Sequence, residues 1–130
     1  PVAEDVVPEP EESFNPFDVL SEVGINSKIG LDYCCGDEDF YLEMLRMFYG
    51  QSVEKREEII SLYEDENWED YAVKVHALKS TSLTIGAEEL SERAKALEQA
   101  GKKEDVAFIR ENHAELVRMH EEVCRSIAGL

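Results

Sequence analysis

Proline is absent from this chain beyond Pro16, and all four prolines lie within the first sixteen residues. Because an internal proline breaks or kinks an α-helix, the rest of the chain can be helical from end to end. Glycine is also sparse, with seven residues in 130. No alternation of apolar and polar residues typical of strands extends over a comparable length. The sequence therefore predicts an all-α fold.

Basic residues are scarce as well. Thirteen Lys and Arg residues stand against thirty Asp and Glu residues, which gives a formal net charge of −17. The phosphates of nucleic acids and of anionic membrane surfaces would repel such a chain, so we expect neither as a partner. No apolar run approaches the roughly 18 residues that a membrane span needs, so membrane insertion is not expected either.

Cysteine is limited to Cys34, Cys35 and Cys124. An odd number with an adjacent pair is not a disulfide framework, and the spacing lacks the Cys-x-x-Cys pattern of metal sites. We expect reduced thiols, mostly buried for structural reasons, and a cytoplasmic location.

Residues 1–15 differ in composition from the rest of the chain. They hold three of the prolines, five acidic residues and no basic residue, and they cannot bury enough apolar surface to order themselves. We predict a linker over residues 1–15, which would tether a folded domain over residues 16–130 within a longer protein.

The remaining pattern predicts two short helices followed by four long ones. Their expected ranges are 17–23, 27–34, 37–63, 67–85, 87–100 and 104–127. Short connections between long helices favour antiparallel neighbours, so we predict an antiparallel up-and-down four-helix bundle with short N-terminal helices.

Individual residues mark the expected ends of these helices. Asp37 and Asn67 are typical N-terminal caps, and Gly86 suits a left-handed position after a helix. Gly101 is expected to end the third long helix. Gly50, inside the first long helix, indicates either close packing or a weak point.

His76 is the first candidate for a chemical role. On a helical wheel of 100° per residue it lies about 135° from the centre of its helix's apolar stripe, so it should be exposed. Lys79 follows one turn later. Ala72 and Ser80, four residues to either side, are small and leave space around the imidazole. Leu83 provides an exposed apolar contact for a partner.

These residue types suit phosphoryl transfer. A phosphoryl donor must approach an imidazole nitrogen in line, which requires open space. Lys79 would supply positive charge for the transferred oxygens, and an imidazole is available in its neutral, nucleophilic form at cellular pH. Helical geometry alone also allows a surface histidine with no chemical role, and that alternative stays open here.

A family resemblance favours the chemical interpretation. The segment resembles the signature of histidine-containing phosphotransfer (HPt) domains, which reads His-x-Leu-Lys-Gly with Ile/Leu-Gly-Ala about ten residues after the histidine. The matching residues are His76, Leu78, Lys79, Ile85, Gly86 and Ala87, and Leu90 and the pair Leu97-Glu98 continue the similarity. Ser80 departs from the usual glycine. The resemblance covers roughly residues 17–127.

The resemblance implies a phosphoryl carrier without kinase activity of its own. His76 would be phosphorylated by an aspartyl-phosphate of a response-regulator receiver domain and would pass the group to another receiver. Lys79 would support the charge, Gly86 would close the motif structurally, and Ser80 would occupy the small position. No cofactor is implied in this chain, because Mg²⁺ would be held by the receiver. The partners would be receiver domains and a hybrid histidine kinase. Independently of the resemblance, we expect a monomer by default.

Two alternatives remain at this point. The chain could be a non-catalytic helical interaction module, or a bundle phosphorylated in trans by a histidine kinase. His113 and His120, seven residues apart on the apolar stripe of the last helix, could suggest a metal site. They lack a third positioned ligand, so we expect histidines at the edge of the core and no metal.

Overall fold

The computed structural model describes residues 16–130, and the predicted linker over residues 1–15 lies outside the described residues. The described helices are η1 (Asp18–Val23), α3 (Ser27–Tyr33), α4 (Glu38–Gly50), α5 (Ser52–Glu64), α6 (Trp68–Thr84), α7 (Glu88–Lys103) and α8 (Val106–Ala128). Over this range the only β-type pairing is a single bridge between Ile25 and Ala87. The all-α prediction is therefore confirmed for residues 16–130.

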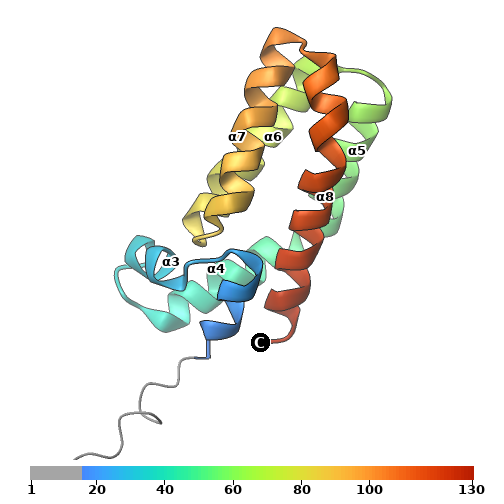
Figure 1. Ribbon diagram of the computed structural model, residues 1–130. Coiled ribbons are helices and arrows are strands. Elements are labelled where there is room, and N and C mark those ends of the chain that lie inside the picture. Colours follow the sequence, from blue (N-terminus) through green and yellow to red (C-terminus); the bar gives the residue numbers. More distant parts are fainter. Residues whose placement is uncertain (1–15) are drawn as a thin grey trace, which may run out of the picture.

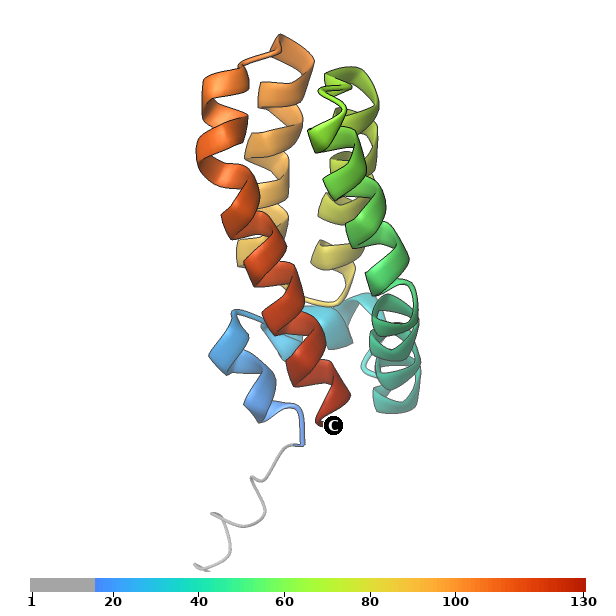
Figure 2. The same ribbon diagram turned by 90° about the vertical axis from the view of Figure 1, so that its right-hand side faces the viewer.

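Four long helices, α5, α6, α7 and α8, lie side by side in both views (Figure 1, Figure 2). Helices η1, α3 and α4 gather at one end of this group, where α6 turns into α7 and where α8 ends. None of the described helices combines the length and hydrophobicity that a membrane crossing requires.

The core is built from one apolar face of each long helix. Residues that recur every three or four positions share a face of an α-helix, so the spacing in the sequence becomes a continuous buried stripe. Fully buried examples are Tyr71 and Val75 on α6, Leu90, Ala94 and Leu97 on α7, and Ile109, Leu116 and Val123 on α8. Each large apolar side chain buried in this way stabilises the fold by about 1.5–3 kcal/mol.

The single helix predicted over 37–63 is wrong, because the structure divides it into α4 and α5. Asp37 does cap α4, accepting a hydrogen bond from the Phe40 backbone amide at 3.1 Å. The chain then bends at Gly50 and Gln51, so α4 crosses beneath the bundle while α5 runs along it (Figure 1). Gly50 is exposed, and a Cβ there would meet no atom within 4 Å, so the glycine is a weak point in the helix. Tyr41 and Leu45 of α4 are fully buried.

The prediction that Gly101 ends the third long helix is also wrong. Helix α7 continues to Lys103, and Glu104 takes the left-handed conformation that follows it, with φ of 54°. Gly101 is buried inside the last turn, where an added Cβ would lie 3.1 Å from Ala72 Cβ and 3.3 Å from the Trp68 carbonyl oxygen. The missing side chain thus lets α6 and α7 approach closely, and Lys102 lies on a helix and not in a loop.

His113 and His120 lie in the core, more deeply than expected. His113 Nδ1 is 2.9 Å from the Tyr71 hydroxyl, and its ring stacks on Tyr63 with centroids 3.8 Å apart. His120 Nδ1 is 3.0 Å from Arg56 Nη1. Burial lowers the pKa of each histidine to about 4, with Arg56 adding to the effect at His120.

Both of these histidines are therefore uncharged at neutral pH and act as hydrogen-bonding core residues. Over residues 16–130 no group of three His, Cys, Asp or Glu side chains could hold a metal ion.

Gly86 joins the end of α6 to the N-terminal helices. Its φ of +87° is a left-handed conformation, and its carbonyl accepts a hydrogen bond from the Asn26 amide at 2.7 Å. The Tyr41 hydroxyl donates to the neighbouring Ile85 carbonyl at 2.8 Å. A Cβ on Gly86 would lie only 2.1 Å from the Asn26 carbonyl oxygen. Glycine is thus required both by the backbone conformation and by the close approach of Asn26.

We expect Gly86→Ala to destabilise the domain by about 2–5 kcal/mol, because backbone strain and overpacking add. Gly36→Ala is the matched control, since Gly36 also has a left-handed φ, of +78°, but nothing lies within 4 Å of its Cβ position. It should lose only about 1–2 kcal/mol. Urea unfolding measures both losses. If both variants lose the same free energy of unfolding, the close approach of Asn26 to residue 86 does not contribute to the loss.

Candidate functional site

Helix α6 holds His76 at the surface of the bundle. Asn67 begins the helix by accepting a hydrogen bond from the Asp70 amide at 3.2 Å, while its own side-chain amide donates to the Asp70 carboxylate at 3.1 Å. Val75 and Leu78 are buried, and they fix the rotation of α6 about its axis. His76 therefore faces outward, and 55% of its side chain is exposed.

Glu98 of α7 is the partner of the imidazole. Its Oε2 atom lies 2.8 Å from His76 Nδ1 and 3.1 Å from Lys102 Nζ, and its Oε1 atom lies 2.8 Å from Lys79 Nζ. Only 5% of the Glu98 side chain is exposed. One buried carboxylate thus joins a histidine and a lysine of α6 to a lysine of α7.

The charge of this carboxylate follows from its partners. Burial alone would raise the pKa of Glu98, but hydrogen bonds from Lys79, Lys102 and His76 outweigh it and lower the pKa to about 2. Glu98 is therefore ionised at neutral pH. An ionised carboxylate only accepts hydrogen bonds, so Nδ1 of the neutral imidazole carries the hydrogen. The lone pair is then on Nε2, which is the nitrogen available as a nucleophile.

An open pocket lies beside His76 between α6 and α7. Besides the histidine, the residues that line it are Glu69, Ala72, Val73, Glu98, Gly101, Lys102 and Glu104. Three of these residues are acidic and one is a lysine. Ala72 and Gly101 are the smallest of them, and both are buried where the two helices meet. The small residues leave room next to the imidazole for a group of the size of a phosphoryl group.

The structure brings only some of the predicted site residues together. Lys79 shares Glu98 with His76, and Ala72 lines the pocket but is buried against Gly101. Ser80 is exposed one turn from the histidine, and its carbonyl accepts a hydrogen bond from the Thr84 hydroxyl at 3.0 Å. Leu83 is 38% exposed, two turns from His76 and outside the pocket. The roles predicted for these four residues stay predictions.

A family model, that of the Hpt domain, matches residues 43–126, from within α4 to the last turn of α8. The chain belongs to the Hpt domain family. Hpt domains take part in phosphotransfer in two-component signalling and interact with receiver domains. The family predicted from the sequence motif is thus confirmed. No curated protein and no solved structure matches the chain.

Sequence reasoning missed the roles of Glu98 and Lys102 in this Hpt domain. A signal was available, because Glu98 follows buried Leu97 and lies four residues after Ala94, on a face of α7 that is otherwise small or apolar. An acidic residue on a buried face needs a cationic partner, because an unpaired buried charge is costly. Lys102, four residues further on, is one such partner on the same helix.

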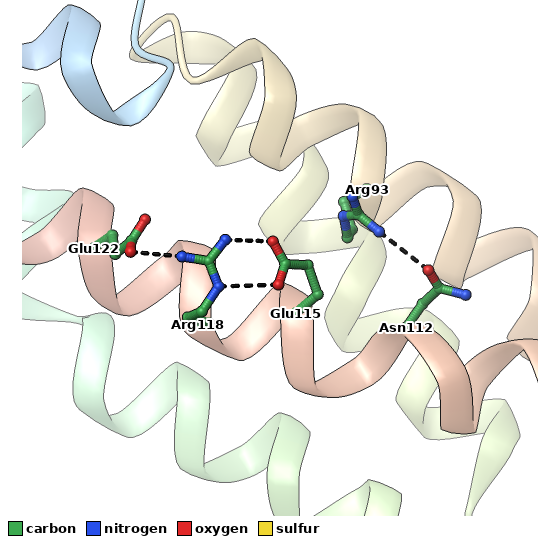
Figure 3. Close-up of polar contacts among 5 residues, drawn as sticks. All are labelled: Arg93, Asn112, Glu115, Arg118 and Glu122. Atoms are coloured by element: carbon green, nitrogen blue, oxygen red, sulfur yellow. Dashed lines mark hydrogen bonds and ion pairs between the residues drawn. The ribbon is translucent and has the colours of Figure 1, made fainter.

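A second group of charges in the Hpt domain lies between α7 and α8 (Figure 3). Arg118 forms ion pairs with Glu115 and Glu122 on its own helix, and Arg93 of α7 donates to the Asn112 side chain of α8 at 3.0 Å. These arginines and acids largely pair with one another, and the group holds no histidine or cysteine that could act as a nucleophile. The residues around His76 are therefore the better candidate site.

We expect Glu98→Gln to lower the free energy of unfolding at pH 7 by about 1–3 kcal/mol, because two lysines lose their ionised partner. The folded pKa of Glu98, about 2, is below its unfolded value, 4.5. Its stabilising effect is therefore complete above pH 4.5 and is lost as the pH falls through about 2.

The free-energy gap between wild type and Glu98→Gln should accordingly narrow between pH 5 and pH 2. Denaturant unfolding of both proteins at each pH measures this gap, and the titration of all other groups largely cancels in the difference. A gap that stays constant over this range would contradict an ionised, lysine-paired Glu98.

Proposed function

We propose that this domain relays a phosphoryl group between aspartates of receiver domains, with His76 as the phosphorylated residue. The observation that carries the proposal is the state of the imidazole. His76 is exposed, its Nδ1 lies 2.8 Å from ionised Glu98, and its imidazole lines the pocket. The domain would act as a carrier without kinase activity of its own, in the cytoplasm and as part of a sensor histidine kinase.

The transfer needs one bond to form and one to break. The Nε2 lone pair of His76 attacks the phosphorus of an aspartyl-phosphate, and the bond between phosphorus and the aspartyl oxygen breaks, leaving that oxygen with the electron pair as a carboxylate. The hydrogen on Nδ1 stays on the ring, where Glu98 stabilises the positive charge that the imidazole gains. The second transfer is the reverse reaction, with the aspartate of another receiver as the nucleophile.

Lys79 would support the charge of the transferred group. Its amine is 2.8 Å from Glu98 Oε1, so the carboxylate holds it one helical turn from the imidazole. A lysine amine is a point charge on a flexible stem, and it can turn from a carboxylate towards a phosphoryl oxygen. Mg²⁺ would be supplied by the carboxylates of the receiver, and this chain would contribute no cofactor site.

The surface next to His76 suits docking through apolar contacts. Val73 is 60% exposed on α6, and Leu83 is 38% exposed. Between α6 and the bend of α4 and α5 lies a groove that is mainly apolar, with Met44, Met47 and Phe48 of α4 among its lining residues. A receiver that covers this surface would bring its phosphorylated aspartate to His76 while excluding water.

The arrangement of the helices supports the bundle topology that we propose with this function. The sequence colours run in alternating directions along α5, α6, α7 and α8 (Figure 1). The connections between them are short, as an antiparallel up-and-down four-helix bundle requires. Such a bundle holds α6 rigid along its length, which keeps His76 in one orientation.

We expect His76→Gln to abolish labelling when the domain is incubated with a phosphorylated receiver and Mg²⁺. Glutamine keeps the polarity and approximate size of the side chain but lacks the nucleophilic nitrogen. His113→Gln is a control at a buried histidine, and it should still be labelled if it folds. The label on wild type should be labile in acid and stable in base, as expected for a phosphohistidine.

Other outcomes would identify the alternatives. Labelling by ATP and a histidine kinase, but by no receiver, would indicate a domain phosphorylated in trans. Labelling of His76→Gln equal to wild type would rule out His76 as the phosphorylated residue. Absence of label from receivers, kinase and small phosphodonors would favour an interaction module without a phosphotransfer role.

We expect Ser80→Gln to slow transfer from a receiver about tenfold or more, because a longer side chain one turn from His76 obstructs the approach of the donor. Ser61→Gln is the matched control, an exposed serine on α5 that lies outside both the pocket and the apolar groove. Stopped-flow or gel-based transfer rates with one receiver compare the variants. Equal transfer rates for the two variants would show that the side chain at residue 80 does not limit the access of a donor to His76.

A further inference from the structure

Two unpaired carboxylates lie at one end of the pocket beside His76. Glu69 of α6 and Glu104, which follows α7, line this pocket with the histidine. Both residues are exposed, and within residues 16–130 neither side chain has an ion-pair partner. Glu98 differs from them, because lysines of α6 and α7 pair with its carboxylate. The negative charge of Glu69 and Glu104 therefore acts on whatever group occupies the pocket.

The position of the two glutamates follows from the close packing of α6 and α7. Glu69 precedes His76 by seven residues, which is two helical turns, so both lie on the same face of α6. An added Cβ at Gly101 of α7 would lie 3.3 Å from the Trp68 carbonyl oxygen, and the Glu104 amide donates to the Gly101 carbonyl at 3.1 Å. Because Trp68 is the neighbour of Glu69 in the chain, the two glutamates lie at the same end of the pocket.

The backbone gives no reason for a glutamate at residue 104. Its φ of 54° is left-handed, and glycine or asparagine adopts this conformation more readily than glutamate does. Its side chain makes no compensating contact within the part of the chain that the structure describes. A residue that departs from the local preference in this way points to a role outside the fold.

We propose that Glu69 and Glu104 raise the free energy of phosphorylated His76, so that the domain passes its phosphoryl group on and does not store it. This inference rests on the proposed function. A phosphoryl group carries a charge of about −1.5 to −2 at neutral pH. Two nearby carboxylates repel it, whereas they do not repel the uncharged imidazole that remains after transfer. The repulsion opposes loading and favours release to a receiver aspartate, so phosphorylated His76 is an intermediate of low occupancy.

The equilibrium constant for exchange with one receiver that phosphorylates the wild type measures this effect. One phosphoryl group moves from the aspartyl oxygen of the receiver to Nε2 of His76, and no other bond changes in the balance. For the free proteins, this constant does not depend on how tightly the two proteins bind. The test compares Glu69→Gln, Glu104→Gln and the double variant with Glu57→Gln, which removes an exposed carboxylate of α5 outside the pocket.

We expect the double variant to shift this constant about three- to tenfold towards phosphorylated His76 at low ionic strength, the effect of two charges acting across a solvent-exposed pocket. Each single variant should give part of the shift, and Glu57→Gln should match wild type. Added salt should reduce the shift, because ions screen charges that are exposed to solvent. Circular dichroism confirms that each variant is folded, and the single variants suffice if the double variant is not.

A second readout needs no receiver. Phosphoramidate phosphorylates each variant, and the ³¹P chemical shift followed against pH gives the midpoint at which the phosphoryl group takes up a proton. Neighbouring carboxylates favour the protonated, less charged form and so raise this midpoint. It should therefore fall in the double variant and not in Glu57→Gln. Glu69 also lies in the first turn of α6, where an acidic residue stabilises the helix, but that role alone would not move the midpoint.

The outcomes separate this inference from the proposed function. If wild type gives no phosphohistidine with phosphoramidate or with a phosphorylated receiver, the proposed function fails, and this inference fails with it. If wild type is phosphorylated and the double variant keeps either the equilibrium constant or the midpoint of Glu57→Gln, the role of the two glutamates is overturned while the relay stands. A shifted constant together with a lowered midpoint supports the proposal.

Discussion

The buried carboxylate of Glu98 is the interaction on which the site depends. A buried charge without partners is strongly unfavourable, so the carboxylate must hold cationic or donor groups around it. It holds three, His76, Lys79 and Lys102, from two helices. The same requirement that stabilises the α6–α7 interface thereby fixes the tautomer of the imidazole and gathers two lysines beside it. The need of the Glu98 carboxylate for partners therefore accounts both for the stability of the interface and for the tautomer of the imidazole.

Such an arrangement is possible only where α6 and α7 are very close. Gly101 packs on Ala72 one turn before His76, and a single Cβ at residue 101 would already be in tight contact. Leu97 is fully buried next to Glu98 and sets the rotation of α7. Because the helix backbones are held by these contacts, the reach from α7 to the imidazole is short enough for a direct hydrogen bond. The small residues therefore serve the site through packing, and they also leave its pocket open.

Much of the fold and part of the site could be predicted from the sequence. Helical periodicity fixed which faces are buried, and the caps at Asp37 and Asn67 and the turn at Gly86 followed from local chemistry that the structure retains. Periodicity could not show that the helix bends at Gly50, because a glycine in a helix is compatible with both packing and bending. It also could not distinguish a terminating glycine from a packing glycine at residue 101. Glu98, the partner of His76, lies 22 residues away, and such a pairing depends on how two helices dock, which no local pattern contains.

The motif around His76 therefore encodes two physical tasks in one segment. Its first part, from His76 to Ser80, places the imidazole and the Lys79 amine one turn apart, as the nucleophile and the cation of the proposed transfer. In its second part, Ile85 to Ala87, backbone carbonyls accept hydrogen bonds from the Asn26 amide and the Tyr41 hydroxyl, which close the end of the bundle with the N-terminal helices. A histidine that must meet a donor in line needs a helix that cannot rotate or slide. Helix α6 is held at two places, at its end by the contact of Gly86 with Asn26 and at His76 by the contact with Glu98.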